Sequence, residues 1–236
     1  MNKTILLASL RATVRIVPEV IPHLSAKARR EICEPTEYKT YEFFLSAIVG
    51  LVEGVYQGFI GGVFIDTLAN LISGQLEDAY MRAWADEGYF SELPPYLRSA
   101  LESLILTQYE HVDQFYRDIV NARVDETSIV PLINRANLWA QRWVEAYNEA
   151  LRLIALENGD RLIWQLGATE QHCTTCGALN GIVAFAKEWD ELGVHPQGGP
   201  NALLECGGWK CDCSLSRTDQ RRSPKAYDTI LNIVNQ

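Results

Sequence analysis

Five of the six cysteines in this 236-residue chain lie in two short segments near its C-terminus. The first segment is "HCTTCGALNG" (172–181) and the second is "CGGWKCDC" (206–213). Their thiols are Cys173, Cys176, Cys206, Cys211 and Cys213. Two cysteines separated by two residues can hold one metal ion from a single tight turn, and zinc prefers tetrahedral thiolate or imidazole ligands. The spacing therefore predicts a structural Zn²⁺ site whose ligands come from both segments.

The two segments offer more thiols than one tetrahedral site needs. Five thiols exceed four coordination positions, so one thiol is spare or is replaced by His172 or His195. In an extended stretch Cys211 and Cys213 project to the same side, whereas Cys206 can fold back through the glycines that follow it. We rank the pair in the first segment ahead of Cys211, and Cys211 ahead of Cys206 and Cys213.

Other cysteine chemistries fit this pattern less well. Disulfides need an oxidising compartment, and the apolar stretch "TILLASL" is interrupted by Arg11 and Arg15 before it could serve as a secretory signal. A thioredoxin-like motif would open a helix after a strand, and a zinc deaminase would need a His-x-Glu segment upstream. A catalytic zinc keeps an open coordination position, whereas surplus thiols favour a closed site. We therefore expect a reducing compartment and no enzymatic activity.

The composition indicates a globular chain that does not bind polyanions over its whole surface. Apolar residues make up 47% and charged residues 22% of the chain, which is ordinary for a folded protein. With 21 basic against 30 acidic side chains the net charge is −9, whereas a phosphate backbone requires clustered Lys and Arg. We expect no sequence-specific nucleic-acid partner.

Small residues recur at every fourth position in the longest apolar stretch, residues 41–76. They are Ser46, Gly50, Gly54, Gly58 and Gly62. On a helix this glycine stripe lets another backbone approach closely, as in a self-associating or membrane-active helix. Glu53 and Asp66 shorten the uncharged runs below the length that a spanning helix needs. The favoured structure is a buried helix or a tight helical hairpin turning near residues 61–62, while self-association and membrane contact stay open.

Helical periodicity continues well beyond this stretch. Apolar residues at three-and-four spacing from Leu97 to Ile119 predict one long helix. Thr127 or Ser128 can cap the next helix, whose apolar face continues until residues 158–159 stop it. After that point "LIWQLG", "GIVAFA" and "CDCSLS" predict short strands.

The sequence thus predicts a mainly α fold, with an elongated helical body followed by a small, irregular α+β module similar to a zinc knuckle. The expected divisions are an N-terminal arm with short helices (1–37), the helical body with the glycine-striped helix (38–160), the cysteine-rich zinc module (161–216) and a C-terminal tail helix (217–236). Because the module has little core of its own in this prediction, we expect metal-binding energy to fold it.

A series of short motifs runs from the helical body into the cysteine module. The motif positions are Arg135, Trp164, Cys173 with Cys176, Leu179 with Gly181, and Cys211 with Cys213. Their order resembles the phage minor head protein family, the head-morphogenesis group typified by the F protein of phage Mu, over about residues 75–216. That family places a His-Pro pair before the final Cys-x-Cys. Gly208 stands at the His position here, so Cys206 is a candidate for that ligand position.

The resemblance implies a non-enzymatic structural protein of the virion that acts in head morphogenesis, in the capsid interior or at the portal vertex. It also implies assembly in the cytoplasm of the bacterial host and contact with the portal protein, the major capsid protein or both. Two other functions stay open: a membrane-active protein delivered with the phage genome, and a zinc-dependent enzyme.

Overall fold

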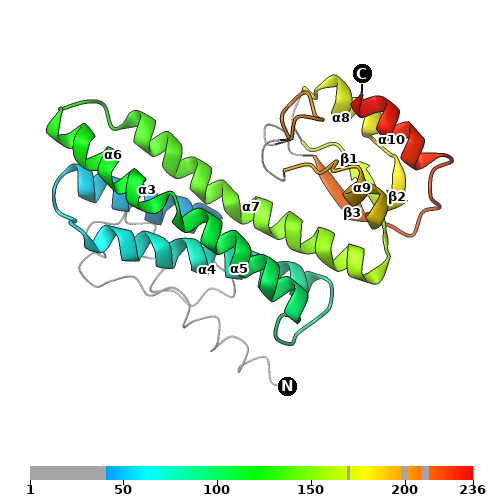
Figure 1. Cartoon of the computed structure of the whole chain (residues 1–236), viewed down its shortest axis with the longest axis horizontal. Helices are drawn as coiled ribbons and strands as arrows, with labels where there is room; N and C mark the ends of the chain where they lie inside the picture. Colours follow the sequence, from blue (N-terminus) through cyan, green and yellow to red (C-terminus); the bar gives the residue numbers. More distant parts are fainter. Residues whose placement is uncertain (1–40, 169–170, 198–200, 209–212, 236) are drawn as a thin grey trace. The chain divides into compact units, whose positions relative to one another are not determined.

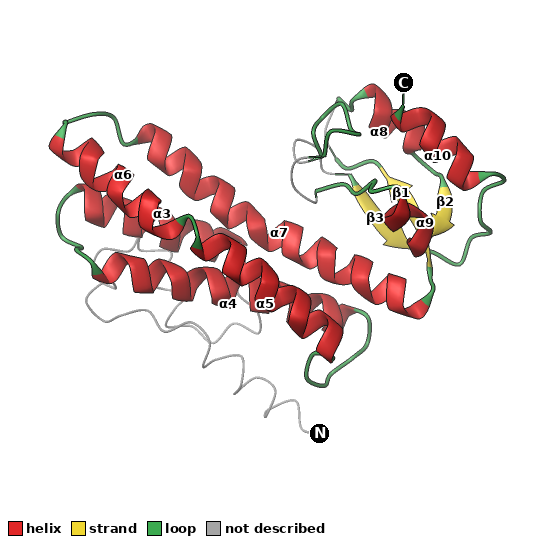
Figure 2. Ribbon diagram, viewed as in Figure 1, coloured by secondary structure: helices red, strands yellow, loops and turns green. Residues whose placement is uncertain are grey.

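The described part of the chain folds into a series of helices with a small sheet near the C-terminus (Figures 1 and 2). The structure, a computed structural model, describes residues 41–168, 171–197, 201–208 and 213–235. The helices and strands in chain order are α3 (Tyr41–Tyr56), α4 (Val63–Asp86), α5 (Pro95–Tyr109), α6 (Val112–Val124), α7 (Val130–Asn158), β1 (Arg161–Gln165), α8 (Thr174–Leu179), β2 (Val183–Phe185), α9 (Ala186–Glu191), β3 (Ser214–Arg217) and α10 (Ala226–Val234). The predicted mainly α fold with a small sheet near the C-terminus is confirmed. The expected N-terminal arm lies outside the described residues.

The chain divides into two compact units, residues 1–146 and 147–236, which we call the helical unit and the cysteine unit. The division falls inside α7 and not at residue 160, because the last turns of this helix belong with the C-terminal residues. Ala155, near the end of α7, lies in the core of the cysteine unit. Ala226 and Ile230 of α10 lie in the same core, so residues 217–236 are not a separate tail.

The longest apolar stretch forms a helical hairpin, as predicted. α3 ends at Tyr56 and α4 begins at Val63, so the turn spans residues 57–62 and starts earlier than the predicted position near residues 61–62. Gly58 has a φ of +81°, a conformation that favours glycine. The N–H of Phe59 donates to the carbonyl of Gly54 at 2.9 Å, which is the bond that closes a glycine-terminated helix end. The helix therefore ends at this position because glycine can adopt a positive φ.

This turn also ends the glycine stripe. Gly50 and Gly54 are buried in α3, whereas Gly58 and Gly62 are exposed in the turn. The stripe therefore does not continue along a single helix face. Among the helices that the structure describes, none combines the length and the apolar character needed to cross a lipid bilayer.

The helix predicted to run from Leu97 to Ile119 is two helices. α5 ends at Tyr109, and α6 begins at Val112 and continues along the bundle (Figure 1). The N–H of His111 donates to a carbonyl only three residues earlier, at 3.2 Å, so the last turn of α5 tightens before the break. The prediction was wrong because apolar spacing continues across the break. The buried stripe positions are Leu97, Leu101, Val112, Phe115 and Ile119.

Buried polar contacts join α4 and α7 inside the helical unit. Gln75 Nε2 donates to the carbonyl of Trp139 at 2.9 Å. Trp143 Nε1 donates to the carboxylate of Asp78 at 3.0 Å, and both Gln75 and Asp78 are buried. Because an unpaired polar group is costly in a core, these contacts fix how α7 lies against α4.

α7 also starts as predicted, since the N–H of Val130 donates to Ser128 Oγ at 3.3 Å.

A three-stranded antiparallel sheet in the order β2-β1-β3 positions the elements of the cysteine unit (Figure 2). In the central strand, Ile163 pairs with Val183 of β2 and with Ser216 of β3. The three predicted strands are confirmed. α8, which carries Cys176, lies between β1 and β2 in the chain, and β3 begins directly after Cys213. The sheet therefore fixes the C-terminal end of each cysteine segment, because β2 follows the first segment and β3 follows the second.

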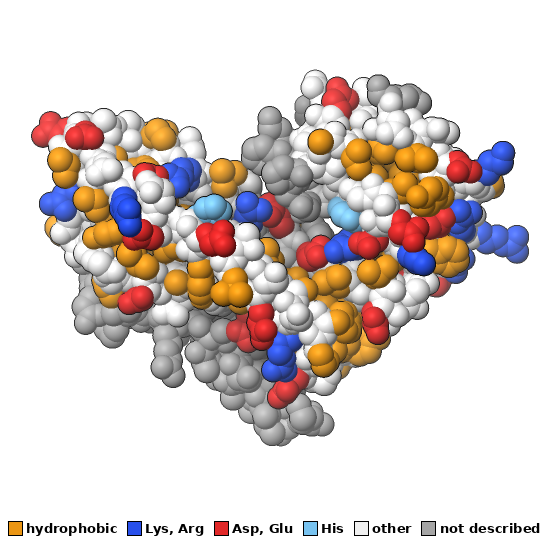
Figure 3. Space-filling view, in the orientation of Figure 1, with side chains coloured by type: hydrophobic (Ala, Val, Ile, Leu, Met, Phe, Trp, Pro, Cys, Tyr) orange, Lys and Arg blue, Asp and Glu red, His pale blue; other side chains and the backbone are white. Residues whose placement is uncertain are grey.

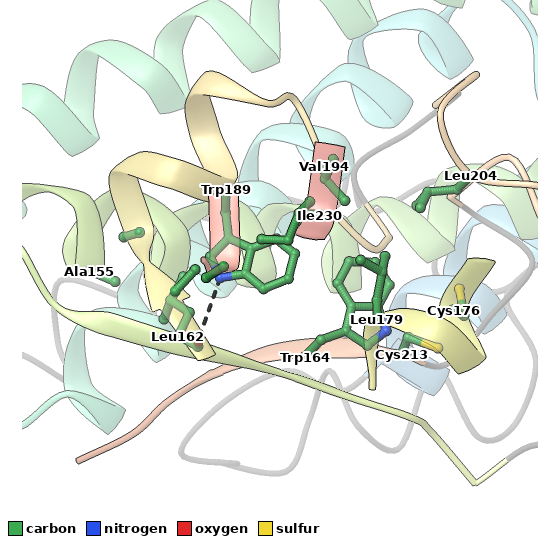
Figure 4. Packing of buried hydrophobic residues seen from close by; sticks show 13 residues of the cluster. Ala155, Leu162, Trp164, Cys176, Leu179, Trp189, Val194, Leu204, Cys213 and Ile230 are labelled. Carbon is green, nitrogen blue, oxygen red and sulfur yellow. Dashed lines mark hydrogen bonds between the residues drawn. The ribbon is translucent and has the colours of Figure 1, made fainter. Parts of the chain in front are cut away.

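The cysteine unit has a hydrophobic core, whereas the sequence predicted that this module has little core of its own. Trp164 of β1 and Trp189 of α9 are fully buried, with ring centroids 5.7 Å apart. Trp189 Nε1 donates to the carbonyl of Leu162 at 3.3 Å (Figure 4, dashed line). Cys176 and Cys213 belong to the same cluster. The other members are Ala155, Leu162, Leu179, Ala184, Ala186, Val194, Leu204, Ala226 and Ile230.

Charged side chains of both signs are interspersed on the face drawn in Figure 3.

In the cysteine unit, Glu188 of α9 accepts a hydrogen bond from Arg222 Nε at 2.8 Å and another from the N–H of Phe185 at 2.9 Å. The hydrogen bond from Arg222 lowers the pKa of Glu188 below its ordinary 4.5, against the opposing effect of burial. The pair therefore links α9 to the segment that follows β3.

This ion pair predicts a pH dependence for the stability of the cysteine unit. Because the pKa of Glu188 is lower in the folded chain, its contribution is complete above pH ~4.5 and is lost as pH falls through the folded pKa. Glu188→Gln should therefore reduce the loss of unfolding free energy on acidification, measured by urea unfolding at several pH values. Glu191→Gln, on the exposed part of α9, is the control. Identical pH profiles for Glu188→Gln and the unaltered chain would contradict the prediction.

Candidate metal centre

α8 presents the first pair of thiols from one turn. Cys173 is the N-cap of this helix, in an extended conformation with φ −67° and ψ 158°, and its Sγ accepts a hydrogen bond from the N–H of Cys176 at 3.4 Å. Cys176 lies inside the helix and is fully buried, whereas Cys173 is partly exposed. The predicted tight turn around a Cys-x-x-Cys pair is therefore present, with one sulfur capping the helix that carries the other. The expectation that this pair does not open a helix after a strand was wrong, because α8 begins at Thr174 and follows β1 in the chain.

A loop of residues 201–208, the Cys206 loop, brings the third thiol. Gly207 and Gly208 have φ values of +72° and +80°, which L side chains rarely adopt. The N–H of Gly207 donates to the carbonyl of Leu204 at 2.7 Å and closes a turn around Cys206. The chain therefore folds back at these glycines, as predicted for Cys206.

Three sulfur atoms, from the N-terminal end of α8 and from the Cys206 loop, form one cluster. The Sγ atoms of Cys173, Cys176 and Cys206 all lie within 4.8 Å of one another, and those of Cys176 and Cys206 are 3.7 Å apart. Two sulfurs bound to one zinc ion at about 2.3 Å with tetrahedral angles are about 3.8 Å apart. The cluster can therefore hold a metal ion with little movement of its thiols.

Hydrogen bonds favour the ionised form of the first thiol. Burial raises the pKa of the Cys173 thiol, but hydrogen bonds from Cys176 and Cys206 outweigh burial and lower its pKa below 9.0. The thiolate is the form of cysteine that binds metal. The turn that shapes the cluster thus also prepares Cys173 as a ligand.

The remaining candidate ligands lie outside this group of three or outside the described residues. Cys213 is fully buried in the core, and its Sγ lies 4.0 Å from His172 Nδ1. His195 Nε2 lies 4.0 Å from Asp190 Oδ1, and burial lowers the pKa of its imidazole. Cys211 lies outside the described residues. Among the described side chains, the group that could hold a metal consists of three thiols and no carboxylate.

Reasoning from sequence missed one residue beside the thiols. The carboxylate of Glu205 accepts a hydrogen bond from the backbone N–H of Thr174 at 2.8 Å. These two residues adjoin Cys206 and Cys173, respectively. No spacing rule predicts such a contact, because it joins two segments that are distant in sequence.

Comparison with protein-family models, with curated proteins and with solved structures finds no match to this chain. The resemblance to the phage minor head family therefore rests on its short motifs. Three motif residues, Trp164, Cys176 and Leu179, lie together in the core of the cysteine unit. Arg135 belongs to the helical unit, where its guanidinium lies 4.7 Å from the centre of the Phe115 ring.

The cluster predicts that metal content depends on particular thiols. The unaltered chain should bind one Zn²⁺ tightly, and Cys176→Ser should lose most of this affinity because a buried thiolate ligand is removed. Elemental analysis and titration against a chromophoric chelator measure both. Cys33→Ser is the matched control, since Cys33 is far from both segments in sequence. Unchanged zinc binding by Cys176→Ser would rule out the cluster as the site.

Proposed function

We propose that this chain is a non-enzymatic structural protein whose cysteine unit is locked by one structural Zn²⁺ ion. The observation that carries the proposal is the meeting of Cys173, Cys176 and Cys206, with a sulfur separation that fits tetrahedral zinc. A set of thiols without a carboxylate in the group favours zinc over magnesium or calcium, which prefer oxygen ligands.

The proposed ion acts on a unit that already has a core. In a peptide that is unfolded without metal, zinc supplies the folding free energy, about 10–16 kcal/mol. Here Trp164 and Trp189 pack in a buried apolar cluster, so hydrophobic burial also contributes to the folding of the unit. The ion would instead cross-link α8 to the Cys206 loop at the edge of this core. Its effect is therefore local.

Removing the metal should loosen the cross-linked segments and leave the sheet folded. With a strong chelator, backbone amides in residues 171–180 and 201–208 should exchange hydrogen faster, while those of β1 and α9 should change little because the tryptophan core persists. Hydrogen-exchange mass spectrometry measures this, and residues of α4 in the helical unit are the internal control. Global unfolding of the cysteine unit, or no change at all, would contradict a local structural role.

We also propose that the chain is a phage minor head protein, located in the capsid interior or at the portal vertex and acting in head morphogenesis. Support comes from the motif order, which runs from Arg135 to the cysteine segments, and from a helical unit followed by a cysteine unit. A thiol cluster without a carboxylate is also consistent with a structural rather than a catalytic role. The partners would be the portal protein, the major capsid protein or both.

Particles of the phage that encodes the chain test this second proposal. The chain should be detected by mass spectrometry in purified virions, should cross-link to the portal or major capsid protein, and its deletion should reduce the yield of complete heads. A known non-structural phage protein serves as the control for carry-over during purification. Absence of the chain from virions and from assembly intermediates would overturn the phage role while leaving the zinc proposal intact.

A further inference from the structure

Glu205 joins the two segments that carry the clustered thiols. Its Oε2 accepts a hydrogen bond from the backbone N–H of Thr174 at 2.8 Å, across 31 positions of sequence. Thr174 is the first residue of α8 and follows Cys173, while Glu205 precedes Cys206. The contact therefore links the neighbours of two thiols without involving any metal.

We infer that Glu205 is a positioning residue of the metal centre. Its carboxylate holds the Cys206 loop against α8, so that Cys206 stands beside the first pair of thiols before an ion binds. This inference rests on the proposed zinc-binding function of the cluster and adds a residue that controls its affinity.

The first turn of α8 explains why a carboxylate suits this position. The first N–H groups of a helix have no acceptor within the helix. In α8 the N–H of Cys176 donates to Cys173 Sγ, and the N–H of Thr174 donates to Glu205. A charged acceptor makes a stronger hydrogen bond than a neutral one. The turn that presents two thiols therefore also fixes the segment that supplies the third.

The other end of the Cys206 loop has separate anchors. Asn201 Nδ2 donates to the carbonyl of Gly193 at 2.8 Å, and Asn201 Oδ1 accepts from the N–H of Leu203 at 3.0 Å. Leu204 is buried in the core. These contacts hold the loop before Cys206, and Glu205 directs the following residues toward α8. Without Glu205, the carbonyls of Gly207 and Gly208 would still accept from the N–H groups of Asn201 and Gln197. The loop would lose the contact with the first turn of α8, and metal binding would have to restrict that approach.

The charge of Glu205 has to be separated from its role as a tether. A negative charge near a bound dication also strengthens binding, by attraction, at any position close to the site. Glu205→Gln removes the charge but keeps a carbonyl oxygen that can accept from Thr174, whereas Glu205→Ala removes both. Glu191→Ala removes one exposed carboxylate from the same unit and is the control for net charge.

Zinc affinity of these variants tests the inference in the full-length chain. Competition with a chromophoric chelator should show binding that is weaker by about 10–100-fold for Glu205→Ala, the range typical of residues that orient metal ligands. Glu205→Gln should retain most of the affinity, and Glu191→Ala should match the unaltered chain. Equal affinity for Glu205→Ala and the unaltered chain, or equal losses for Glu205→Ala and Glu205→Gln, would overturn the tether.

A second measurement does not depend on zinc. In the metal-free chain, Glu205→Ala should speed hydrogen exchange at Thr174 and in residues 203–206, while the circular dichroism of the helices stays unchanged. Unchanged exchange would overturn the inference even if zinc binding is normal. Failure of the unaltered chain to bind zinc would overturn the proposed function, and the exchange result would still decide whether Glu205 holds the loop.

Discussion

The candidate metal centre depends on the close approach of two segments that are 30 positions apart, seen in the 3.7 Å separation of the Cys176 and Cys206 sulfurs. Neither segment could hold this geometry alone. Cys176 is placed by α8, which packs its buried side on the core around Trp164. Cys206 is placed by a loop whose path is fixed by two left-handed glycines and by hydrogen bonds from Asn201. The thiol cluster is thus a consequence of packing and loop conformation together.

The parts of the site that could be predicted from sequence are the local ones. The Cys-x-x-Cys turn needs only its own residues, because the Cys173 sulfur caps the helix that contains Cys176. The choice of a partner thiol in the second segment depends on loop hydrogen bonds, which leave no periodic signal. Glu205 was missed for the same reason, since its acceptor role exists only once Thr174 has come within reach.

The fold shows the same division between local and distant causes. The hairpin was predicted with its turn near residues 61–62, whereas α3 already ends at Tyr56, before Gly58 adopts a conformation that favours glycine. The break between α5 and α6 was not, because apolar spacing continues across His111. The core of the cysteine unit was underestimated, since Trp164, Trp189 and Ile230 come from three short elements. The boundary between the two units, which lies inside α7, could not be predicted either, because the apolar face of this helix continues across it.

A metal that closes a loop on an existing core differs from a metal that creates a fold. When a chain has no core, coordination and folding are one transition, and loss of the ion abolishes the structure. When the core forms independently, coordination mainly removes the freedom of the loop that it closes, a term that grows slowly with loop length. In this chain the loop carries Cys206 and Glu205 beside α8. The proposed ion would therefore determine the conformation of the loop that carries Cys206 and Glu205, and leave the tryptophan core unchanged.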